Sequence, residues 1–321
     1  MMLTDDENAV LLGLDFVDLY VGQSYADIRM SGGTDTPTFP LQGNLLNQAL
    51  ALRGFCIKER EKCGEDEFTL RILGYVFRVT TLHPYAEQLV FVLRRSNIRT
   101  HELTSLGFTK PVIDALLDKK ASGLVLICGE MSSGKTSTAA SLVSARLSSI
   151  GGYAVSIEDP IETGLGGAHG KGRCVQIRAS LKCGGYKEPL IRAMRTGAEQ
   201  ILIGETREED TAFEVAKASI NGHFIITTVH AGSIGQAVER IVTMCSGKHP
   251  EIGAVLADGL SCIIYQELVS VGNKSQLRAK TLLLSDPKLG DAIRERIRTG
   301  KYGQLREFIE QQAQTYLHGN H

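Results

Sequence analysis

From residue 121 onward, short runs of apolar residues alternate with stretches of helical spacing, and this alternation constrains the fold more than any other feature. The apolar runs are continuous, as in LVLIC (124–128), QILIG (200–204) and HFIITTV (223–229). Each is followed by a helical pattern, such as EEDTAFEVAKAS (208–219). Strands that alternate with helices form βαβ units in a parallel sheet that is buried on both faces. Residues 121–321 are therefore predicted to form an α/β domain with a mostly parallel sheet.

Residues 1–100 are predicted to form a separate, small α+β domain. Stretches rich in β-branched and aromatic residues have the length of strands and are separated by glycine, asparagine and aspartate turn signals. Between them, residues 44–60 show the helical spacing of apolar positions. The expected strands are DFVDLYV (15–21), SYADIRM (24–30), FTLRILG (68–74), YVFRVTTL (75–82) and QLVFVLRR (88–95).

Residues 101–120 are predicted to be a linker that contains the short helix PVIDALLDK (111–119). Two domains also agree with the length of 321 residues, because a single hydrophobic core seldom grows beyond about 250 residues.

Composition excludes several classes of partner and site. The chain has 35 Lys and Arg against 36 Asp and Glu, so it lacks the net basic field that gathers nucleic acid or anionic lipid. Apolar runs such as LVLIC and TLLL fall far short of the roughly 20 residues that cross a bilayer, and the N-terminus lacks the pattern of a signal peptide. Seven cysteines without a CxxC pair indicate reduced structural thiols. We expect a cytoplasmic protein that contacts no nucleic acid.

The segment GEMSSGKTSTAASL (129–142) follows directly on the apolar run LVLIC. Gly129, Gly134, Lys135 and Thr136 satisfy the pattern GxxxxGK[ST], in the required context of strand, loop and helix. Such a loop turns its backbone N–H groups toward a phosphate, the lysine reaches the outer phosphates and the threonine binds Mg²⁺. The alternative, an ordinary glycine-rich turn, does not explain the four fixed positions. The expected nucleotide-binding residues are Gly129, Ser132, Ser133, Gly134, Lys135, Thr136 and Ser137.

Polar residues follow three other predicted strands. Glu205 ends QILIGE, His230 ends TTVH, and YAVSIEDPIE (153–162) leads into Glu158, Asp159 and Glu162. Each alone is weak evidence, because such a residue is often a helix cap or a solvated loop residue. Ligands of open α/β sheets bind at the carboxyl ends of the strands, so these side chains are expected to gather around the phosphate loop.

Four motifs in order resemble those of the type II and type IV secretion ATPases, most closely the PilT-type pilus retraction motors. GEMSSGKT resembles the Walker A box, SIEDPIE the Asp box, ILIGETREEDT the Walker B box and NGHFIITTVHAGS the His box. The resemblance covers about residues 121–270. It is weaker on either side, where FVDLYV and YVFRVTTL resemble a PAS-like N-terminal domain. It implies a RecA-like P-loop NTPase domain behind that domain.

The resemblance also implies roles for individual residues. Lys135 and Thr136 are expected to bind the phosphates and Mg²⁺, with Glu205 as a second Mg²⁺ ligand. Glu162 and Glu205 resemble the pair that handles Mg²⁺ and the attacking water, and which of them is the general base stays open. His230 is expected near the γ-phosphate, with His223 as a second candidate.

Arginines of the small domain resemble those that close over the nucleotide at a domain or subunit boundary. A surface linker without a partner is the alternative for each of them. The candidates are Arg78, Arg94, Arg95 and Arg99, of which Arg94 and Arg99 are preferred.

The family consists of hexameric motors, so the resemblance implies a homo-hexamer that uses ATP and Mg²⁺ and acts on an inner-membrane platform protein. The chain would then be peripheral at the inner membrane, with membrane contact only through its partner. A RecA-like or helicase-like DNA translocase, a conjugation or type IVB secretion ATPase, and a small-molecule kinase are the alternatives. Glu130 and Met131 stand where the family commonly has Pro and Thr, which leaves the direction of the motor open.

Overall fold

The structure is a computed structural model that describes residues 9–31, 36–85, 88–96, 98, 100–180, 184–271 and 274–318. The chain divides into two compact units. The first comprises residues 1–98 and 160–164, and the second comprises residues 99–159 and 165–321. Each unit has a hydrophobic core of its own.

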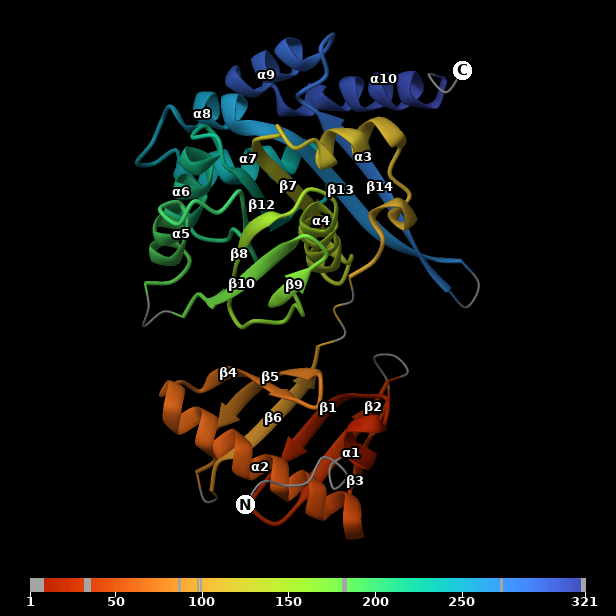
Figure 1. Cartoon of the computed structure of the whole chain (residues 1–321), viewed down its shortest axis with the longest axis vertical. Helices are drawn as coiled ribbons and strands as arrows, with labels where there is room; N and C mark the ends of the chain where they lie inside the picture. The colour runs from red at the N-terminus through yellow and green to blue at the C-terminus, as the bar shows by residue number, and fades with distance from the viewer. Residues whose placement is uncertain are drawn as a thin grey trace. The chain divides into compact units, whose positions relative to one another are not determined.

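The first unit is an antiparallel sheet with one long helix (Figure 1). Its strand order is β3-β2-β1-β6-β5-β4, and every neighbouring pair is antiparallel. The elements are α1 (Ala9–Gly13), β1 (Phe16–Val21), β2 (Ala26–Met30), β3 (Thr38–Pro40), α2 (Gly43–Cys63), β4 (Glu67–Ile72), β5 (Tyr75–Leu82) and β6 (Val90–Arg95).

Helix α2 packs against this sheet through side chains that recur at helical spacing. Ala49, Leu52 and Cys56 are fully buried, and they share a core with Phe16 and Phe77, whose rings are stacked with centroids 6.0 Å apart. The helix ends at Gly64, which adopts φ 67° and donates its N–H to the carbonyl of Arg60. A glycine is favoured there because its left-handed backbone has no Cβ to clash.

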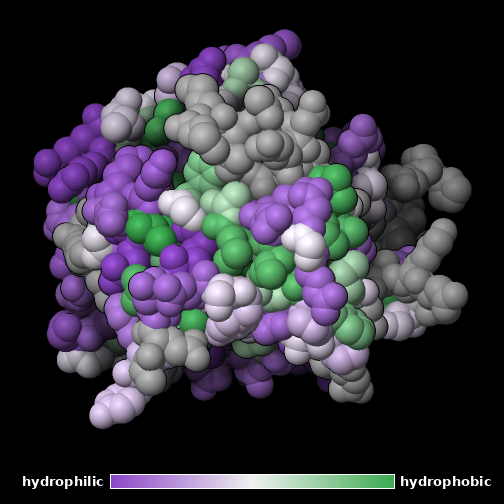
Figure 2. Space-filling view, turned by 90° about the horizontal axis from the view of Figure 1, so that it is seen from below, coloured by the Kyte–Doolittle hydropathy of each residue, from purple (hydrophilic) through white to green (hydrophobic). Residues whose placement is uncertain are grey.

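Apolar side chains also reach the surface of the first unit. On α2, the half-buried Leu45, Leu46, Leu50, Phe55 and Ile57 lie beside its core. Seen from below, apolar side chains gather in a patch among polar ones (Figure 2). The helix is therefore apolar around much of its circumference.

The second unit is built on an eight-stranded sheet in the order β14-β13-β7-β12-β11-β8-β10-β9. The six central strands are parallel, and the edge strands β14 and β9 are antiparallel to their neighbours. The strands are β7 (Gly123–Gly129), β8 (Gly152–Glu158), β9 (Gly167–His169), β10 (Gly172–Arg178), β11 (Gln200–Ile203), β12 (Phe224–His230), β13 (Leu260–Val271) and β14 (Lys274–Leu283).

Helices cover both faces of this sheet, which explains why its strands are continuously apolar. One face carries α4 and the other carries α5, α6 and α7 (Figure 1). The helical elements are η1 (Leu103–Leu106), α3 (Lys110–Leu117), α4 (Lys135–Ser149), α5 (Lys187–Ala193), α6 (Glu209–Ser219), α7 (Ile234–Cys245), α8 (Ile252–Gly259), α9 (Gly290–Arg298), η3 (Tyr302–Gln304) and α10 (Leu305–His318).

The α/β fold with a mostly parallel sheet, preceded by a small α+β unit, confirms the fold predicted from the sequence. Among the described residues, α1, β3, β9, η1 and η3 were not predicted. They have only three to five residues each, too few for a periodic pattern. No described helix combines the length and apolar composition that a membrane span requires.

The strand order brings the carboxyl ends of β7, β12, β11 and β8 to one edge of the sheet. In register, His230 pairs with Gly129, and Ile203 pairs with Ile157. The residues that follow these strands belong to the motifs singled out in the sequence.

Candidate active site

The phosphate loop joins β7 to α4 and requires unusual backbone angles. Gly134, at the N-terminus of α4, has φ 85°, and Ser132 has φ 60°. Both lie in the left-handed region that L-residues rarely adopt. The loop therefore holds a compact turn in front of the first N–H groups of a 15-residue helix, which is a favourable arrangement for an anion.

Strand β13 supports this loop through Gln266. The side chain of Gln266 on β13 is fully buried, and its Nε2 donates a hydrogen bond to the carbonyl of Ser133 at 2.7 Å. The main-chain oxygen of Gln266 would lie 2.2 Å from a Cβ added at Gly129. Glycine is thus needed at position 129 because the backbones of β13 and the loop approach so closely.

Lys135 lies at the start of α4 with its ammonium group folded over the loop. Its Nζ donates to the carbonyls of Gly129 (3.0 Å) and Glu130 (2.7 Å). Burial lowers the pKa of Lys135, while the negative charges of Glu205 and Glu130 oppose that shift. A partly desolvated cation of this kind interacts strongly with an anion, because little water screens it.

His230 at the end of β12 contacts both Lys135 and Glu205. Its Nδ1 lies 3.4 Å from Nζ of Lys135, and its Nε2 lies 3.5 Å from Oε1 of Glu205. An ammonium group can only donate, so Nδ1 is the acceptor in the contact with Lys135. The imidazole thus bridges the lysine and the glutamate.

Two threonines fix Glu205 beside β12. The hydroxyl of Thr228 donates to the carbonyl of Gly204 at 2.7 Å, and the N–H of Thr206 donates to the carbonyl of Thr228 at 2.9 Å. The side chains of Glu205 and His230 stay 30% and 36% exposed. Lys135, His230 and Glu205 therefore form one contact chain whose carboxylate and imidazole are open to solvent.

The residues of this loop fit a nucleotide triphosphate and Mg²⁺. Among the described residues, the buried hydroxyl oxygen of Ser133 has no hydrogen-bond partner, and the loop offers helix N–H groups and a lysine to an anion. Among the residues that the structure describes, no three His, Cys, Asp or Glu side chains gather closely enough to hold a metal ion. Mg²⁺ fits this arrangement, because it commonly binds through one or two protein oxygens and the phosphates themselves, here Thr136 and Glu205.

A cavity of about 580 Å³ opens beside His230. Glu130 and the side of α7 that carries Gln236 and Arg240 contribute to its walls. Arg240 also donates from NH1 to the carbonyl of His230 at 3.1 Å. His230 at the end of β12 is thus contacted by Arg240 at its main chain and by Lys135 and Glu205 at its ring, and it lines the cavity.

The first carboxylates of the Asp box have structural partners. Glu158 is buried and accepts hydrogen bonds from Ser156 (2.5 Å) and Gln176 (2.9 Å). The carboxylate of Asp159 lies 3.4 Å from Nε of Arg178. Glu158 is therefore not the solvated turn residue that the sequence left open.

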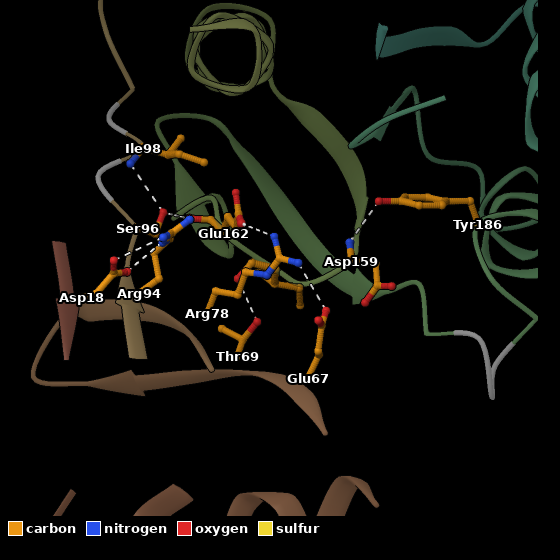
Figure 3. Close-up of polar contacts among 11 residues, drawn as sticks. Asp18, Glu67, Thr69, Arg78, Arg94, Ser96, Ile98, Asp159, Glu162 and Tyr186 are labelled. Carbon is orange, nitrogen blue, oxygen red and sulfur yellow. Dashed lines mark hydrogen bonds and ion pairs between the residues drawn. The ribbon is translucent and has the colours of Figure 1, made fainter. Parts of the chain in front are cut away.

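Glu162 belongs to the first unit, whereas Lys135, His230 and Glu205 belong to the second. The main-chain oxygen of Glu162 accepts a hydrogen bond from Ser96 at 2.7 Å, and its carboxylate lies 3.8 Å from NH1 of Arg78 (Figure 3). The two carboxylates predicted to handle Mg²⁺ and the attacking water, Glu162 and Glu205, thus belong to different units.

The candidate arginines have different surroundings. Arg94 donates from Nε to the buried carboxylate of Asp18 at 2.8 Å and keeps 61% of its side chain exposed. Arg95 donates to the carbonyls of Leu12 and Leu14, and its guanidinium lies 4.3 Å from the ring centroid of Tyr75. Arg95 therefore makes contacts that stabilise the first unit. Arg99 lies outside the described residues.

His223 precedes β12 at its amino end, at the edge opposite His230. The two histidines are seven positions apart along an extended strand, which corresponds to roughly 20 Å. The interpretation of His223 as a second residue near the γ-phosphate is therefore wrong.

Gln266 and Tyr186 were missed in the sequence. The hydroxyl of Tyr186 accepts the N–H of Asp159 at 3.1 Å (Figure 3), and burial raises the pKa of Tyr186. A glutamine inside the apolar strand SCIIYQELV was the available signal, because a polar side chain in a buried strand needs a partner.

The sequence of this chain matches the sequence profile of one family. The profile described as "Type II/IV secretion system protein" matches residues 37–314. The chain belongs to this family.

Named relatives include two proteins of Pseudomonas aeruginosa. The type IV pilus ATPase PilU is 30% identical over 68% of the chain, and the type IV pilus retraction ATPase PilT is 27% identical over 79% of it. The matched part of the chain spans 56% of the length of PilU and 72% of that of PilT.

Among solved structures, the pilus retraction motor PilT with bound ADP has the same fold. It superimposes with a TM-score of 0.77 over 97% of this chain and 90% of that chain, at 24% sequence identity. The aligned region includes residues of both units of this chain.

Proposed function

We propose that the chain hydrolyses ATP and uses this reaction to drive a pilus or secretion machine. The observation that supports it most directly is the contact chain of Lys135, His230 and Glu205 beside a phosphate loop, in a member of the type II/IV secretion family. Relatives that bear the names of pilus and secretion ATPases support the same reaction.

Each residue of the second unit has a defined task in this proposal. The helix N–H groups, Ser133 and Lys135 bind the phosphates, and Thr136 and Glu205 would hold Mg²⁺, which would supply positive charge to the phosphoryl group when bound. Glu205 orients the attacking water, and the imidazole of His230 beside it keeps that carboxylate in place. The remaining loop candidates, Gly129, Ser132, Gly134 and Ser137, shape the backbone that surrounds the phosphates.

The remaining groups in this proposal come from other parts of the chain. Glu162 of the first unit supplies the second carboxylate for the attacking water. Arg94 of the same unit and Arg99, the first residue of the second unit, neutralise charge on the transferred phosphoryl group, from the same chain or from a neighbouring copy. An arginine in that role typically raises the rate about a thousandfold or more. Closure of the first unit over the nucleotide then couples hydrolysis to movement.

The proposed assembly is a homo-hexamer at the cytoplasmic side of the inner membrane. There it acts on a membrane-embedded platform protein of the pilus or secretion machine, and it contacts the membrane only through that partner.

Phosphate release by purified wild-type protein and Glu205→Gln tests the proposal. The amide keeps the shape of the carboxylate but cannot orient water as a base, so kcat is expected to fall about 100-fold while ATP still binds. Glu208→Gln, an exposed change three residues away, is the matched control and should keep wild-type activity. Equal kcat values for wild type and Glu205→Gln, or absence of ring-shaped hexamers in electron micrographs with an ATP analogue, would contradict the proposal.

A further inference from the structure

The Asp box is divided between the two units. Residues 160–164, here named the Asp-box strap, group with the first unit, although Asp159 and Leu165 on either side belong to the second. The chain thus leaves the second unit after β8, contributes five residues to the first unit and returns.

Three side chains of the first unit donate hydrogen bonds to the main chain of the strap. The hydroxyl of Thr69 on β4 donates to the carbonyl of Ile161 at 2.8 Å, and the hydroxyl of Ser96 after β6 donates to the carbonyl of Glu162 at 2.7 Å (Figure 3). Arg71 donates from NH2 to the carbonyl of Thr163 at 3.2 Å. Three consecutive carbonyls are therefore bonded to one unit.

The carboxylate of Glu162 is held less tightly than its main chain. Its Oε1 lies 3.8 Å from NH1 of Arg78, and Arg78 is also shared with Glu67 at 3.2 Å. The side chain of Glu162 is 34% exposed, and exposed ion pairs contribute little to holding a geometry. The main-chain hydrogen bonds from Thr69 and Ser96 thus position the segment that carries this carboxylate.

Both flanks of the strap are fixed to the second unit. The N–H of Asp159 is bonded to the hydroxyl of Tyr186, and its carboxylate pairs with Arg178. Leu165 is fully buried. The five strap residues thus lie between flanks that belong to the second unit.

We propose that Thr69, Ser96 and Arg71 are positioning residues for Glu162, so that the first unit carries this carboxylate to the nucleotide. The inference rests on the proposed function and deepens it, because it assigns control of hydrolysis to main-chain contacts of the N-terminal unit. Nucleotide binding by the phosphate loop does not depend on the strap. The strap instead determines whether bound ATP is hydrolysed.

The double variant Thr69→Val/Ser96→Ala of the full chain tests this inference, with kcat and KM for ATP as readouts. Two neutral hydrogen bonds contribute about 1 kcal/mol each, so kcat is expected to fall about tenfold or more while KM stays within about twofold. The single variant Thr69→Ser, in which Ser96 is unchanged, keeps the hydroxyl donor and should have the kcat of the wild type. Hydrogen exchange of a peptide that spans the strap should become faster in the double variant.

Thr81→Val is the matched control. Thr81 lies on β5 of the same unit, and its buried hydroxyl has no hydrogen-bond partner among the described residues, so its loss should leave kcat unchanged. A double variant with wild-type kcat, or one whose KM rises as much as kcat falls, would overturn the inference.

Glu162→Gln in the same assay separates the two proposals. If Glu162→Gln loses activity and the double variant does not, the positioning role fails and the proposed function stands. If the wild type hydrolyses no ATP, or Glu162→Gln is fully active, the catalytic role of Glu162 fails and the inference fails with it.

Discussion

At the residue scale, the phosphate loop depends on a side chain that lies more than 130 positions away in the sequence. Gln266 bonds the carbonyl of Ser133, and its main chain fills the space where a side chain at position 129 would lie. Because the loop must keep left-handed backbone angles at Ser132 and Gly134, a fixed support beneath it preserves the geometry that meets a phosphate.

We expect Gln266→Leu to weaken ATP binding about tenfold or more, since it leaves a buried carbonyl without its donor, at a cost of about 1 to 3 kcal/mol. Isothermal titration with ATP measures the effect. Gln312→Leu is the control, because Gln312 is equally buried and bonds the backbone of Leu283, away from the loop. Gln312→Leu should lower the free energy of unfolding and leave the affinity for ATP unchanged. If Gln312→Leu weakened ATP binding and Gln266→Leu did not, the role of Gln266 would be contradicted.

At the element scale, a buried carboxylate joins three strands of the first unit. Asp18 on β1 is paired with Arg29 on β2 and Arg94 on β6. Burial raises the pKa of Asp18, but the hydrogen bonds and charges of the two arginines outweigh it, so the pKa lies below its usual value of 3.8. A pKa that folding lowers contributes stability above the pKa of the unfolded chain, and this contribution is lost as the pH falls through the folded value.

Asp18→Asn is therefore expected to lower the free energy of unfolding of the first unit by about 3 kcal/mol at pH 7, at the low end for broken buried pairs because the arginines can hydrate. The difference from wild type should shrink as the pH falls below about 4. Urea unfolding across this range, with exposed Asp15→Asn as the control, measures it. A difference that does not change with pH would show that the charge of Asp18 is not responsible.

At the scale of the whole molecule, the regular parts of the second unit were predictable and its cross-connections were not. Continuous apolar runs with helical patterns between them predicted the parallel sheet, and residues after strand ends located Lys135, His230 and Glu205 on one edge. The support by Gln266 was hidden because β13 and β7 are neighbours only in the folded sheet. The division of the Asp box was hidden for the same reason, because Thr69 bonds Ile161 and Ser96 bonds Glu162 only through tertiary contacts.

The affinity of the purified chain for ATP with and without the Lys135 ammonium tests the central claim most directly. Isothermal titration of Lys135→Ala should show ATP binding weakened by roughly 10- to 100-fold, as expected for charged hydrogen bonds of about 1.5 to 3 kcal/mol. Lys171→Ala, at an exposed lysine of the same unit, should bind ATP like the wild type. If Lys135→Ala binds ATP as tightly as the wild type, the loop at residues 129–137 is not the nucleotide site.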